Sequence, residues 1–293
     1  MKTKRKVAIV GGNGQLGSDV VEAFAGSHEV HSLTHQDVEL SSLDSVASCL
    51  RAIQPDLVVN TAAMHHVENC ERAPEWAYAV NAVGARNLAT VTQDLGAVLI
   101  HVSTDYVFDG HKACPYTEDD LPLPLSVYGN SKLAGEYFVR TGMEKHIILR
   151  TSALYGRQAC RAKGGNNFVD LMLKLGRERG EVRVVANETV TPTSTRDLAR
   201  QIVVLSDAGV YGLFHATAEG SCSWHEFACE IFAVAGAPAR CLVAGRDEFP
   251  AKVPRPRYSV LENARLKQAG LNQFQDWREG LHVYLEQTCV ATA

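Results

Sequence analysis

A glycine-rich segment near the start of the chain constrains the fold more than any other feature. It reads Gly11-Gly-Asn-Gly14-Gln-Leu-Gly17 and directly follows the apolar run Val7–Val10. A short apolar run, a glycine turn and a helical pattern are typical of the first unit of a dinucleotide-binding sheet. Gly11 would permit the tight turn, Gly14 the approach of backbone amides to a pyrophosphate, and Gly17 close helix packing. The alternative is a strand–helix turn without a ligand.

The first half of the chain alternates short β-branched runs with helical patterns. We expect strands at 7–10, 28–33, 56–60, 97–103 and 146–150, and helices at 15–24, 42–53, from Pro74 towards Leu95, and at 126–140. Such alternation is typical of parallel strands covered by helices on both faces. We therefore predict an α/β fold, a Rossmann-like doubly wound parallel sheet, with residues 1–150 as the NAD(P)-binding domain.

The second half is less regular. We expect helices at 167–179, 196–205, 223–234 and 275–287, extended segments at 182–185 and 212–215, and a proline-rich, non-helical stretch at 249–257. Residues 151–293 are predicted to form mainly a smaller C-terminal substrate-binding domain. Strands and helices from about 190–215 are expected to return to the first domain.

Composition excludes several classes of function. A net charge of −4 and a pI near 6.3 argue against nucleic-acid or membrane partners. The apolar run after the basic N-terminal residues is too short for a secretory signal. Eight cysteines lack a Cys-x-x-Cys pair or a spacing suited to zinc, so we predict reduced thiols, a cytoplasmic location and no metal site. A homodimer is expected only because it is the commonest assembly.

Tyr128 and Lys132 lie four residues apart in a predicted helix, so both side chains are expected on one face. An ammonium beside a phenol favours the phenolate and would bring the phenol pKa towards neutrality. By itself this spacing is more typical of a solvated helix face.

Polar residues at strand ends add to the pair. Ser103-Thr104-Asp105 closes an apolar strand, where a hydroxyl can donate to a substrate carbonyl while Tyr128 supplies a proton. With Lys132, this predicts a three-part site for carbonyl reduction. After the second strand, Asp37 or Glu39 is a candidate for the adenosine part of a cofactor, and a polar loop is nearly as good an interpretation.

These motifs resemble those of the dTDP-4-dehydrorhamnose reductase family, within the extended short-chain dehydrogenases/reductases. The stretches that carry the resemblance run through almost the whole chain: Gly11–Gly17, Asn60-Thr-Ala-Ala63, Ala79-Val-Asn-Ala82, Ser103-Thr-Asp-Tyr-Val-Phe-Asp-Gly110, Tyr128-Gly-Asn-Ser-Lys132, Leu149-Arg-Thr-Ser152, Asn167-Phe-Val169, Thr191-Pro-Thr193, Ser223-Trp224 and Arg255-Pro-Arg-Tyr-Ser-Val-Leu261. The stretches Ser103–Gly110 and Arg255–Leu261 are the most particular to the family.

The resemblance implies that NADPH or NADH delivers hydride to C4 of a dTDP-linked keto-sugar, giving dTDP-L-rhamnose from dTDP-4-dehydro-L-rhamnose. Tyr128 would be the general acid, Lys132 would bind the nicotinamide ribose, and Thr104 would hold the carbonyl. The implied cofactor-binding residues are Gly11, Gly14, Gln15, Leu16, Gly17, Glu39, Leu40, Ala62, Ala63, Tyr128 and Lys132. The implied substrate-binding residues are Thr104, Asp105, Ala153, Asn167 and Arg255. Mg²⁺ at a subunit contact is implied by the resemblance alone.

The departures from the family pattern lie on the substrate side. Ala153 replaces the usual tryptophan, His65 replaces a hydroxyl near the sugar, and residues 157–165 form an enlarged loop with three cations. We interpret this loop as a surface insertion, the alternative being a phosphate clamp. Two other functions stay open: a reductase of a different nucleotide keto-sugar, and a non-catalytic regulatory subunit that binds dinucleotide, as in methionine adenosyltransferase β. The second need not keep Thr104, Tyr128 and Lys132 together.

Overall fold

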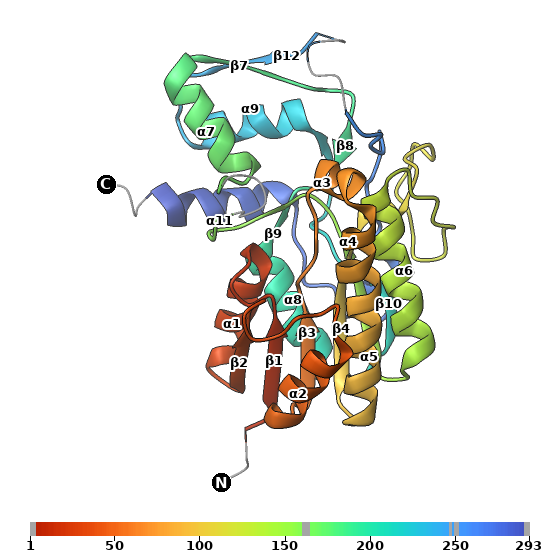
Figure 1. Ribbon diagram of the computed structural model, residues 1–293. Helices are drawn as coiled ribbons and strands as arrows, with labels where there is room; N and C mark the ends of the chain where they lie inside the picture. The colour runs from red at the N-terminus through yellow and green to blue at the C-terminus, as the bar shows by residue number, and fades with distance from the viewer. Residues whose placement is uncertain (1–3, 160–164, 246–247, 249–251, 290–293) are drawn as a thin grey trace.

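The computed structural model describes residues 4–159, 165–245, 248 and 252–289. Its centre is a six-stranded parallel sheet in the order β10-β5-β4-β3-β1-β2 (Figure 1). The strands are β1 (Lys6–Val10), β2 (Glu29–Leu33), β3 (Leu57–Asn60), β4 (Val98–Thr104), β5 (His146–Thr151) and β10 (Gly212–His215). The predicted doubly wound α/β fold is confirmed. The chain reverses direction across the sheet between β1 and β3, which is where such folds bind their ligands.

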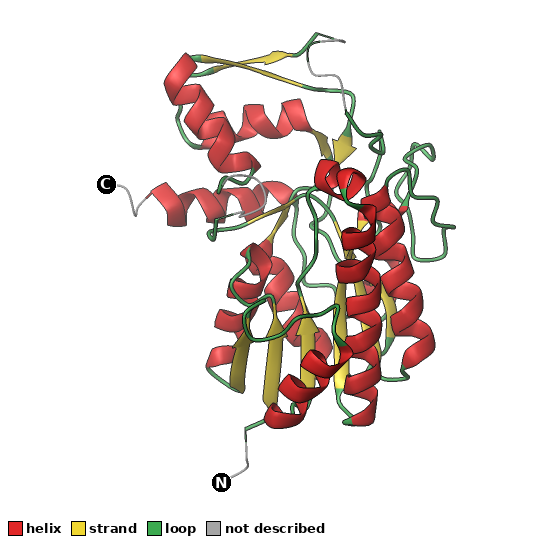
Figure 2. Cartoon of the chain, in the orientation of Figure 1, coloured by secondary structure: helices red, strands yellow, loops and turns green. Residues whose placement is uncertain are grey.

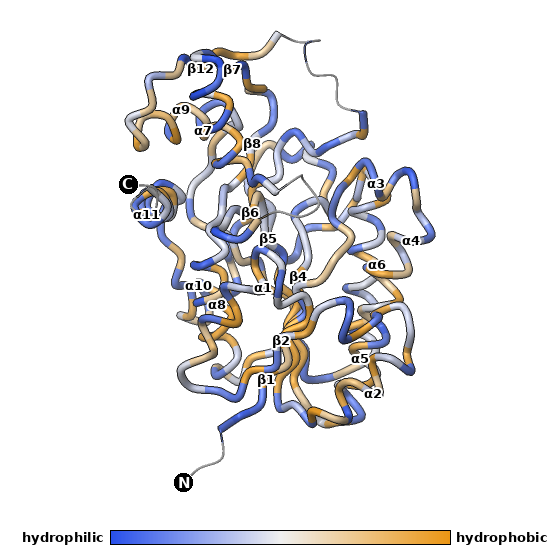
Figure 3. The backbone as a smooth tube through the Cα atoms, turned by 60° about the vertical axis from the view of Figure 1, so that its left-hand side comes forward, coloured by the Kyte–Doolittle hydropathy of each residue, from blue (hydrophilic) through white to orange (hydrophobic). Residues whose placement is uncertain are grey.

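Helices cover both faces of the sheet, as Figure 2 shows. One layer holds α1 (Gln15–Ala25) and α8 (Thr195–Asp207), and the other α2 (Leu43–Ile53), α5 (Gly84–Asp94) and α6 (Val127–Gly142). Alternate residues of β1 serve the two layers: Val7 and Ile9 pack in the first core, and Ala8 and Val10 in the second. In Figure 3 these strands form the hydrophobic centre of the molecule.

The helix predicted from Pro74 to Leu95 is not a single regular α-helix. It consists of α4 (Pro74–Tyr78), the π-helical turn η1 (Ala79–Val83) and α5, and a short helix α3 (Val67–Arg72) that sequence reasoning missed precedes it. A π-turn inserts an extra residue into the helical ladder and is frequent at functional sites. Asn81 lies in this turn and is buried.

The second part of the molecule packs around its own apolar core. It contains α7 (Phe168–Arg179), α9 (Trp224–Val234) and α11 (Trp277–Cys289). Phe227 and Trp277 are fully buried at its centre, with ring centroids 5.6 Å apart. Three two-stranded sheets accompany these helices: β7 (Glu181–Val184) with β12 (Arg240–Val243), β8 (Thr189–Val190) with β11 (Cys222–Ser223), and β6 (Leu154–Tyr155) with β9 (Thr193–Ser194).

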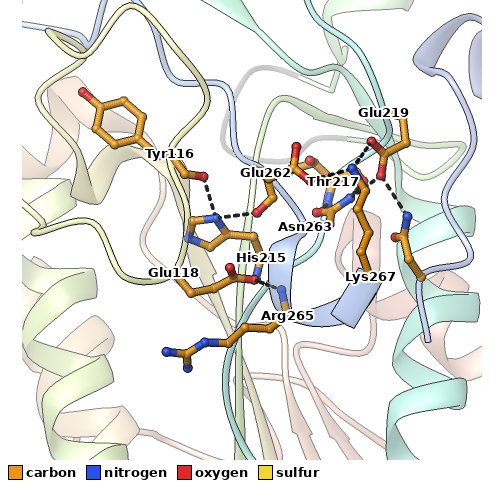
Figure 4. A network of polar contacts seen from close by, with 10 residues as sticks. Tyr116, Glu118, His215, Thr217, Glu219, Glu262, Asn263, Arg265 and Lys267 are labelled. Atoms are coloured by element: carbon orange, nitrogen blue, oxygen red, sulfur yellow. Dashed lines mark hydrogen bonds and ion pairs between the residues drawn. The ribbon is translucent and has the colours of Figure 1, made fainter. Parts of the chain in front are cut away.

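A buried polar network joins the edge strand β10 to two distant segments (Figure 4). The Nδ1 atom of His215 lies 3.0 Å from the carbonyl oxygen of Tyr116 and 3.1 Å from that of Glu262. A Glu118 carboxylate oxygen accepts from the backbone amides of His215 and of Arg265, which lies in α10 (Ala264–Gln268). Burial lowers the pKa of His215 to about 3, so the imidazole is neutral at neutral pH. Its contacts with the two carbonyl oxygens hold these segments together.

Candidate active site

The glycine turn between β1 and α1 has the geometry that a dinucleotide requires. Gly11 has a φ of 80°, and a Cβ there would lie 2.9 Å from the Ala62 nitrogen. A Cβ on Gly17 would lie 2.1 Å from the Gly11 carbonyl oxygen, so only glycine lets α1 approach the turn. Gly14 precedes α1 without a side-chain cap. The amides of the first helical turn are therefore left for an anion.

Neighbouring residues of this turn contact other parts of the fold. The side chain of Gln15 donates to the carbonyl oxygen of Gly156 at 3.3 Å, while Leu16 is buried in the core of the first helix layer. Ala62 and Ala63 follow β3 and are partly exposed, and the Ala62 amide is held by the Asn60 side chain at 3.1 Å. The carboxyl ends of β1 and β3 thus form one wall beside the glycine turn.

The acidic residues after β2 are engaged locally. Asp37 accepts from the backbone and hydroxyl of Thr34, both at 2.8 Å, and so closes a turn. Glu39 is exposed and accepts from the backbone and hydroxyl of Ser41, which lowers the pKa of its carboxyl. Leu40 is buried beside α5. The contact of Glu39 and Leu40 with the adenine of a cofactor stays a prediction.

Close packing places the start of α6 against β4 and η1. Ser126 caps the helix by accepting from the Gly129 amide at 3.2 Å. A Cβ on Gly129 would lie 2.2 Å from the Tyr106 carbonyl oxygen, and one on Gly135 would lie 2.3 Å from the Asn81 carbonyl oxygen. Glycine at both positions lets α6 lie directly on these segments. Tyr128 and Lys132 are therefore set against the end of β4.

Lys132 is almost fully buried, and its Nζ donates to the carbonyl oxygen of Val102 in β4 at 2.7 Å. Burial lowers the pKa of Lys132 to about 8, although the nearby negative charge of Glu136 acts to raise it. The ammonium remains protonated at neutral pH. It is anchored to the sheet as well as carried by α6, an arrangement that the helical spacing did not reveal.

The predicted lowering of the Tyr128 pKa is wrong for this structure. Burial raises the pKa of the phenol, and a hydrogen bond with Thr104 only partly opposes this. The Lys132 ammonium donates to the Val102 carbonyl oxygen, and the groups that shift the pKa of Tyr128 are Thr104, Asp105 and Cys70. Tyr128 is consequently a neutral phenol that holds its proton. This is the form that a proton donor needs in a reduction.

Thr104 ends β4 and lies beside Tyr128. Its hydroxyl donates to Asp105 at 3.1 Å and accepts from the backbone amide of Tyr106 at 3.2 Å. Tyr106 packs edge-on against Tyr128, with ring centroids 5.8 Å apart. The single hydroxyl proton of Thr104 would have to leave Asp105 to reach a substrate carbonyl.

Asp105 is buried under the site rather than exposed on it. It accepts from the Ser152 hydroxyl at 2.8 Å as well as from Thr104. Burial raises the pKa of Asp105 to about 6, while hydrogen bonds from Ser259, Ser152 and Thr104 act in the other direction. The carboxyl therefore positions Thr104, which differs from the direct substrate contact that the resemblance implied.

A buried ion pair that sequence reasoning missed lies below Lys132. Glu136, one turn further along α6, accepts from Arg150 of β5 through Nε at 3.0 Å and Nη2 at 2.7 Å. Both side chains are buried, and Glu136 also accepts from the Ser103 hydroxyl. Ser103 is thus unavailable to a substrate. Glu136 could have been found, since it continues the Tyr128–Lys132 face at the same four-residue spacing.

Asn81 in the π-turn is the second residue that was missed. Its side chain accepts from the Met64 amide and donates to the Met64 carbonyl oxygen, both at 2.9 Å, and donates to Ser131 at 3.0 Å. It ties the segment after β3 to α6. The sequence contained the surrounding family stretch but no signal for this role.

Arg255 lies on the substrate side, close to the tyrosines. Its Nη2 pairs with Glu68 at 2.8 Å, and its buried Nε makes no hydrogen bond within the described residues. Burial acts to lower the pKa of Arg255, but Tyr106, Glu188 and Glu68 raise it. A partly exposed guanidinium with a free donor suits an anionic group of a substrate.

Asn167 has a structural role that was not predicted. Its side chain donates to the Gly156 carbonyl oxygen and to the Tyr284 hydroxyl, both at 2.9 Å, and accepts from the Asp170 amide at 3.0 Å. It caps α7 and is buried. Any substrate contact would have to compete with these three bonds.

Ala153 and the loop that follows it distinguish this chain on the substrate side. Ala153 has a φ of 45°, which is strained for a residue with a Cβ. Arg157 pairs with Glu22 and Asp19 of α1, so this cation is held on the surface as the insertion interpretation expects. The loop cations Arg161 and Lys163 lie outside the described residues. His65 is partly exposed, with Nδ1 3.4 Å from the Ala63 carbonyl oxygen.

The described residues were searched for membrane-spanning helices and for groups of metal-ligating side chains. Within them, no helix is both long and apolar enough to cross a bilayer. The only group of three metal-ligating side chains found there contains His225, Cys229 and Cys241 rather than carboxylates. The described residues therefore offer no support for Mg²⁺.

Comparison with known proteins agrees with this geometry. The family model for the RmlD substrate binding domain matches residues 5–290. The spore coat polysaccharide biosynthesis protein SpsK of Bacillus subtilis is 38% identical over 283 residues, which cover 96% of this chain and 97% of that protein. A dTDP-4-keto-6-deoxy-D-glucose reductase of Streptomyces niveus is 37% identical over 276 residues, covering 93% and 94%.

A solved structure shares the whole fold. The dTDP-4-dehydrorhamnose reductase of Bacillus anthracis, solved in complex with NADP, is 37% identical and superposes with a TM-score of 0.93, covering 97% of this chain and 100% of that one. Together with the family-model match over nearly the full length, these similarities show that the chain belongs to the dTDP-4-dehydrorhamnose reductase family.

Proposed function

We propose that the protein is an NAD(P)H-dependent oxidoreductase that reduces the 4-keto group of a dTDP-linked 6-deoxyhexose, converting dTDP-4-dehydro-L-rhamnose to dTDP-L-rhamnose. The observation that carries the proposal is the convergence of Thr104, Tyr128 and Lys132 at the end of β4. The glycine turn opens at the same edge of the sheet, because all these strands are parallel. The six described cysteines that have a free thiol suit the reducing cytoplasm that we propose as the location.

The described residues fit a nicotinamide cofactor. Gly11, Gly14 and Gly17 provide the turn, and the uncapped amides of α1 suit a pyrophosphate. The other residues proposed to contact the cofactor are Gln15, Leu16, Glu39, Leu40, Ala62, Ala63, Tyr128 and Lys132. When bound, the cofactor supplies hydride to C4 of the sugar. No arginine directly follows β2, and Asp37 and Glu39 are bonded locally, so the test includes both NADH and NADPH.

The protein's own residues supply the proton and hold the carbonyl. Tyr128 donates its proton to the carbonyl oxygen as negative charge develops there, and its raised pKa keeps that proton until the reaction. Lys132, buried and bonded to the Val102 carbonyl oxygen, is proposed to bind the nicotinamide ribose. Thr104 holds the carbonyl oxygen once its hydroxyl turns from Asp105.

The substrate would lie between this site and the second part of the molecule. Arg255 is proposed to contact the diphosphate through the exposed part of its guanidinium, and Ala153 to face the sugar. Asn167 is proposed to contact the nucleotide, for which its amide must exchange one of its three internal hydrogen bonds.

The test is oxidation of NADPH or NADH by the purified protein in the presence of a panel of nucleotide 4-keto-sugars. We expect turnover with the dTDP-linked 6-deoxyhexulose. Tyr128→Phe should lower kcat by roughly 10²- to 10⁴-fold, because a positioned proton donor is removed. Tyr106→Phe is the matched control, as its ring adjoins Tyr128 and it should keep activity. Equal loss in both variants would contradict the assignment.

A different keto-sugar is the second candidate. Ala153 leaves a small side chain where the family usually has tryptophan, and one relative is named for reducing dTDP-4-keto-6-deoxy-D-glucose. Varying the sugar and the base separately in the panel distinguishes these substrates. The regulatory-subunit alternative would gain support only if both cofactors bound but no keto-sugar was reduced.

A further inference from the structure

Three soft metal-ligating side chains meet away from the candidate active site, between α9 and β12. His225 and Cys229 lie four residues apart on one face of α9, and Cys241 lies on β12. Their ligand atoms all lie within 4.8 Å of one another. The proposed reduction uses none of them.

Local structure holds the two elements together. Ser223 and Glu226 form a capping box that starts α9, and the backbone amide of His225 donates to the Val185 carbonyl oxygen at 3.1 Å, just after β7. Strand β12 pairs in parallel with β7, which places Cys241 opposite Val182. Because α9 and β12 both attach to β7, the three ligand side chains are brought to one place.

The distance between the Cys229 and His225 ligand atoms agrees with that between two ligands of one tetrahedral ion. The Cys229 Sγ lies 3.7 Å from the His225 Nε2. In a tetrahedral site with Zn–S near 2.3 Å and Zn–N near 2.0 Å, sulfur and nitrogen ligands are about 3.5 Å apart and two sulfurs about 3.8 Å apart. The Cys241 Sγ lies 3.8 Å from the carbonyl oxygen of His225, so its thiol reaches the same residue.

We infer that His225, Cys229 and Cys241 bind one zinc ion, with water or an added ligand as the fourth donor. Two thiolates and an imidazole form a donor set suited to Zn²⁺ and poorly suited to Mg²⁺ or Ca²⁺. All three side chains are partly exposed, so an ion can enter without unfolding.

The bound ion would fasten an otherwise weakly held strand. Strand β12 has four residues, none of them buried, and β7 is its only partner strand in the described part of the chain. A metal link to α9 would hold β12 to the core of the second part. We therefore expect zinc to raise the Tm of the protein without being needed for turnover.

The test is a titration of the reduced, full-length protein with Co²⁺, a coloured substitute for Zn²⁺. We expect tetrahedral visible bands and a sulfur-to-cobalt charge-transfer band that saturate at one equivalent and vanish on adding Zn²⁺. Absence of the charge-transfer band in the folded wild-type protein overturns the inference.

Single variants assign the ligands. Cys229→Ser and Cys241→Ser should each weaken Co²⁺ binding by roughly 100-fold or more, and His225→Gln should weaken it while leaving both thiols. Cys114→Ser is the control, because Cys114 is exposed and remote in sequence. Circular dichroism of the metal-free variants checks folding. Bands that persist in a folded Cys229→Ser/Cys241→Ser double variant, or a Cys229–Cys241 disulfide in protein purified with reductant, contradict the site.

Discussion

The cofactor side and the substrate side of the candidate site are built differently. On the cofactor side, made of the β1–α1 turn, the end of β4 and α6, Lys132 is buried and bonded to a backbone carbonyl, and Glu136 and Arg150 form a buried ion pair. On the substrate side, made of residues 153–159, 165–167 and 252–261, Arg255 is partly exposed and Ala153 is strained. A rigid reactive half beside an adaptable half allows the sugar to change while the chemistry is kept.

The largest expected effect tests the rigidity of the cofactor side. Glu136→Gln should lower the free energy of unfolding by about 3 to 5 kcal/mol, because Arg150 would keep a buried charge without its partner. Urea unfolding at neutral pH measures this. The control is Glu178→Gln, which removes an exposed pair with Lys174 and should cost no more than about 0.5 kcal/mol. Similar decreases in the free energy of unfolding of the two variants would show that the buried pair stabilises the fold no more than an exposed pair does.

The next effect concerns Asp105, which lies between the two sides. Its pKa is about 6 when folded and near 3.8 when unfolded, so the folded state binds the proton more tightly. Ionising Asp105 should therefore lower stability as the pH rises from about 4 to 6, by on the order of 3 kcal/mol. Asp105→Asn should lack this component.

Comparing the two proteins by urea unfolding across that range isolates Asp105. His215 contributes the opposite trend, because its folded pKa of about 3 lies below its unfolded value of 6.5, but it does so equally in both proteins. Parallel stability curves for wild type and Asp105→Asn would refute the raised pKa.

The smallest effect tests the strain on the substrate side. Ala153→Gly should raise the free energy of unfolding by about 0.5 to 1 kcal/mol, because relief of the left-handed backbone exceeds the greater entropy of glycine in the unfolded chain. Ala233→Gly, at an exposed position in α9, should instead lower it by about 1 kcal/mol. Thermal unfolding of both variants gives the sign of each change in stability. A lower stability of Ala153→Gly would show that the backbone at Ala153 is not strained.

Much of the cofactor side could be predicted because its signals are local. The glycine turn needs only neighbouring residues to specify it, and the Tyr128–Lys132 spacing needs only a helix. The raised pKa of the phenol could not be predicted, since it depends on burial by segments that are distant in the sequence. The same reason explains the missed role of Asn81, whose partners come from two other segments.

Sequence alone determined the class of fold and the family and suggested the candidate reactive residues, because apolar periodicity, turn glycines and short motifs are properties of adjacent residues. Only the tertiary structure decided which of these groups are buried, bonded or strained. The buried partner of Glu136 and the third ligand beside His225 and Cys229 both come from other elements. Such contacts depend on how helices and strands pack, and no spacing along the chain specifies them.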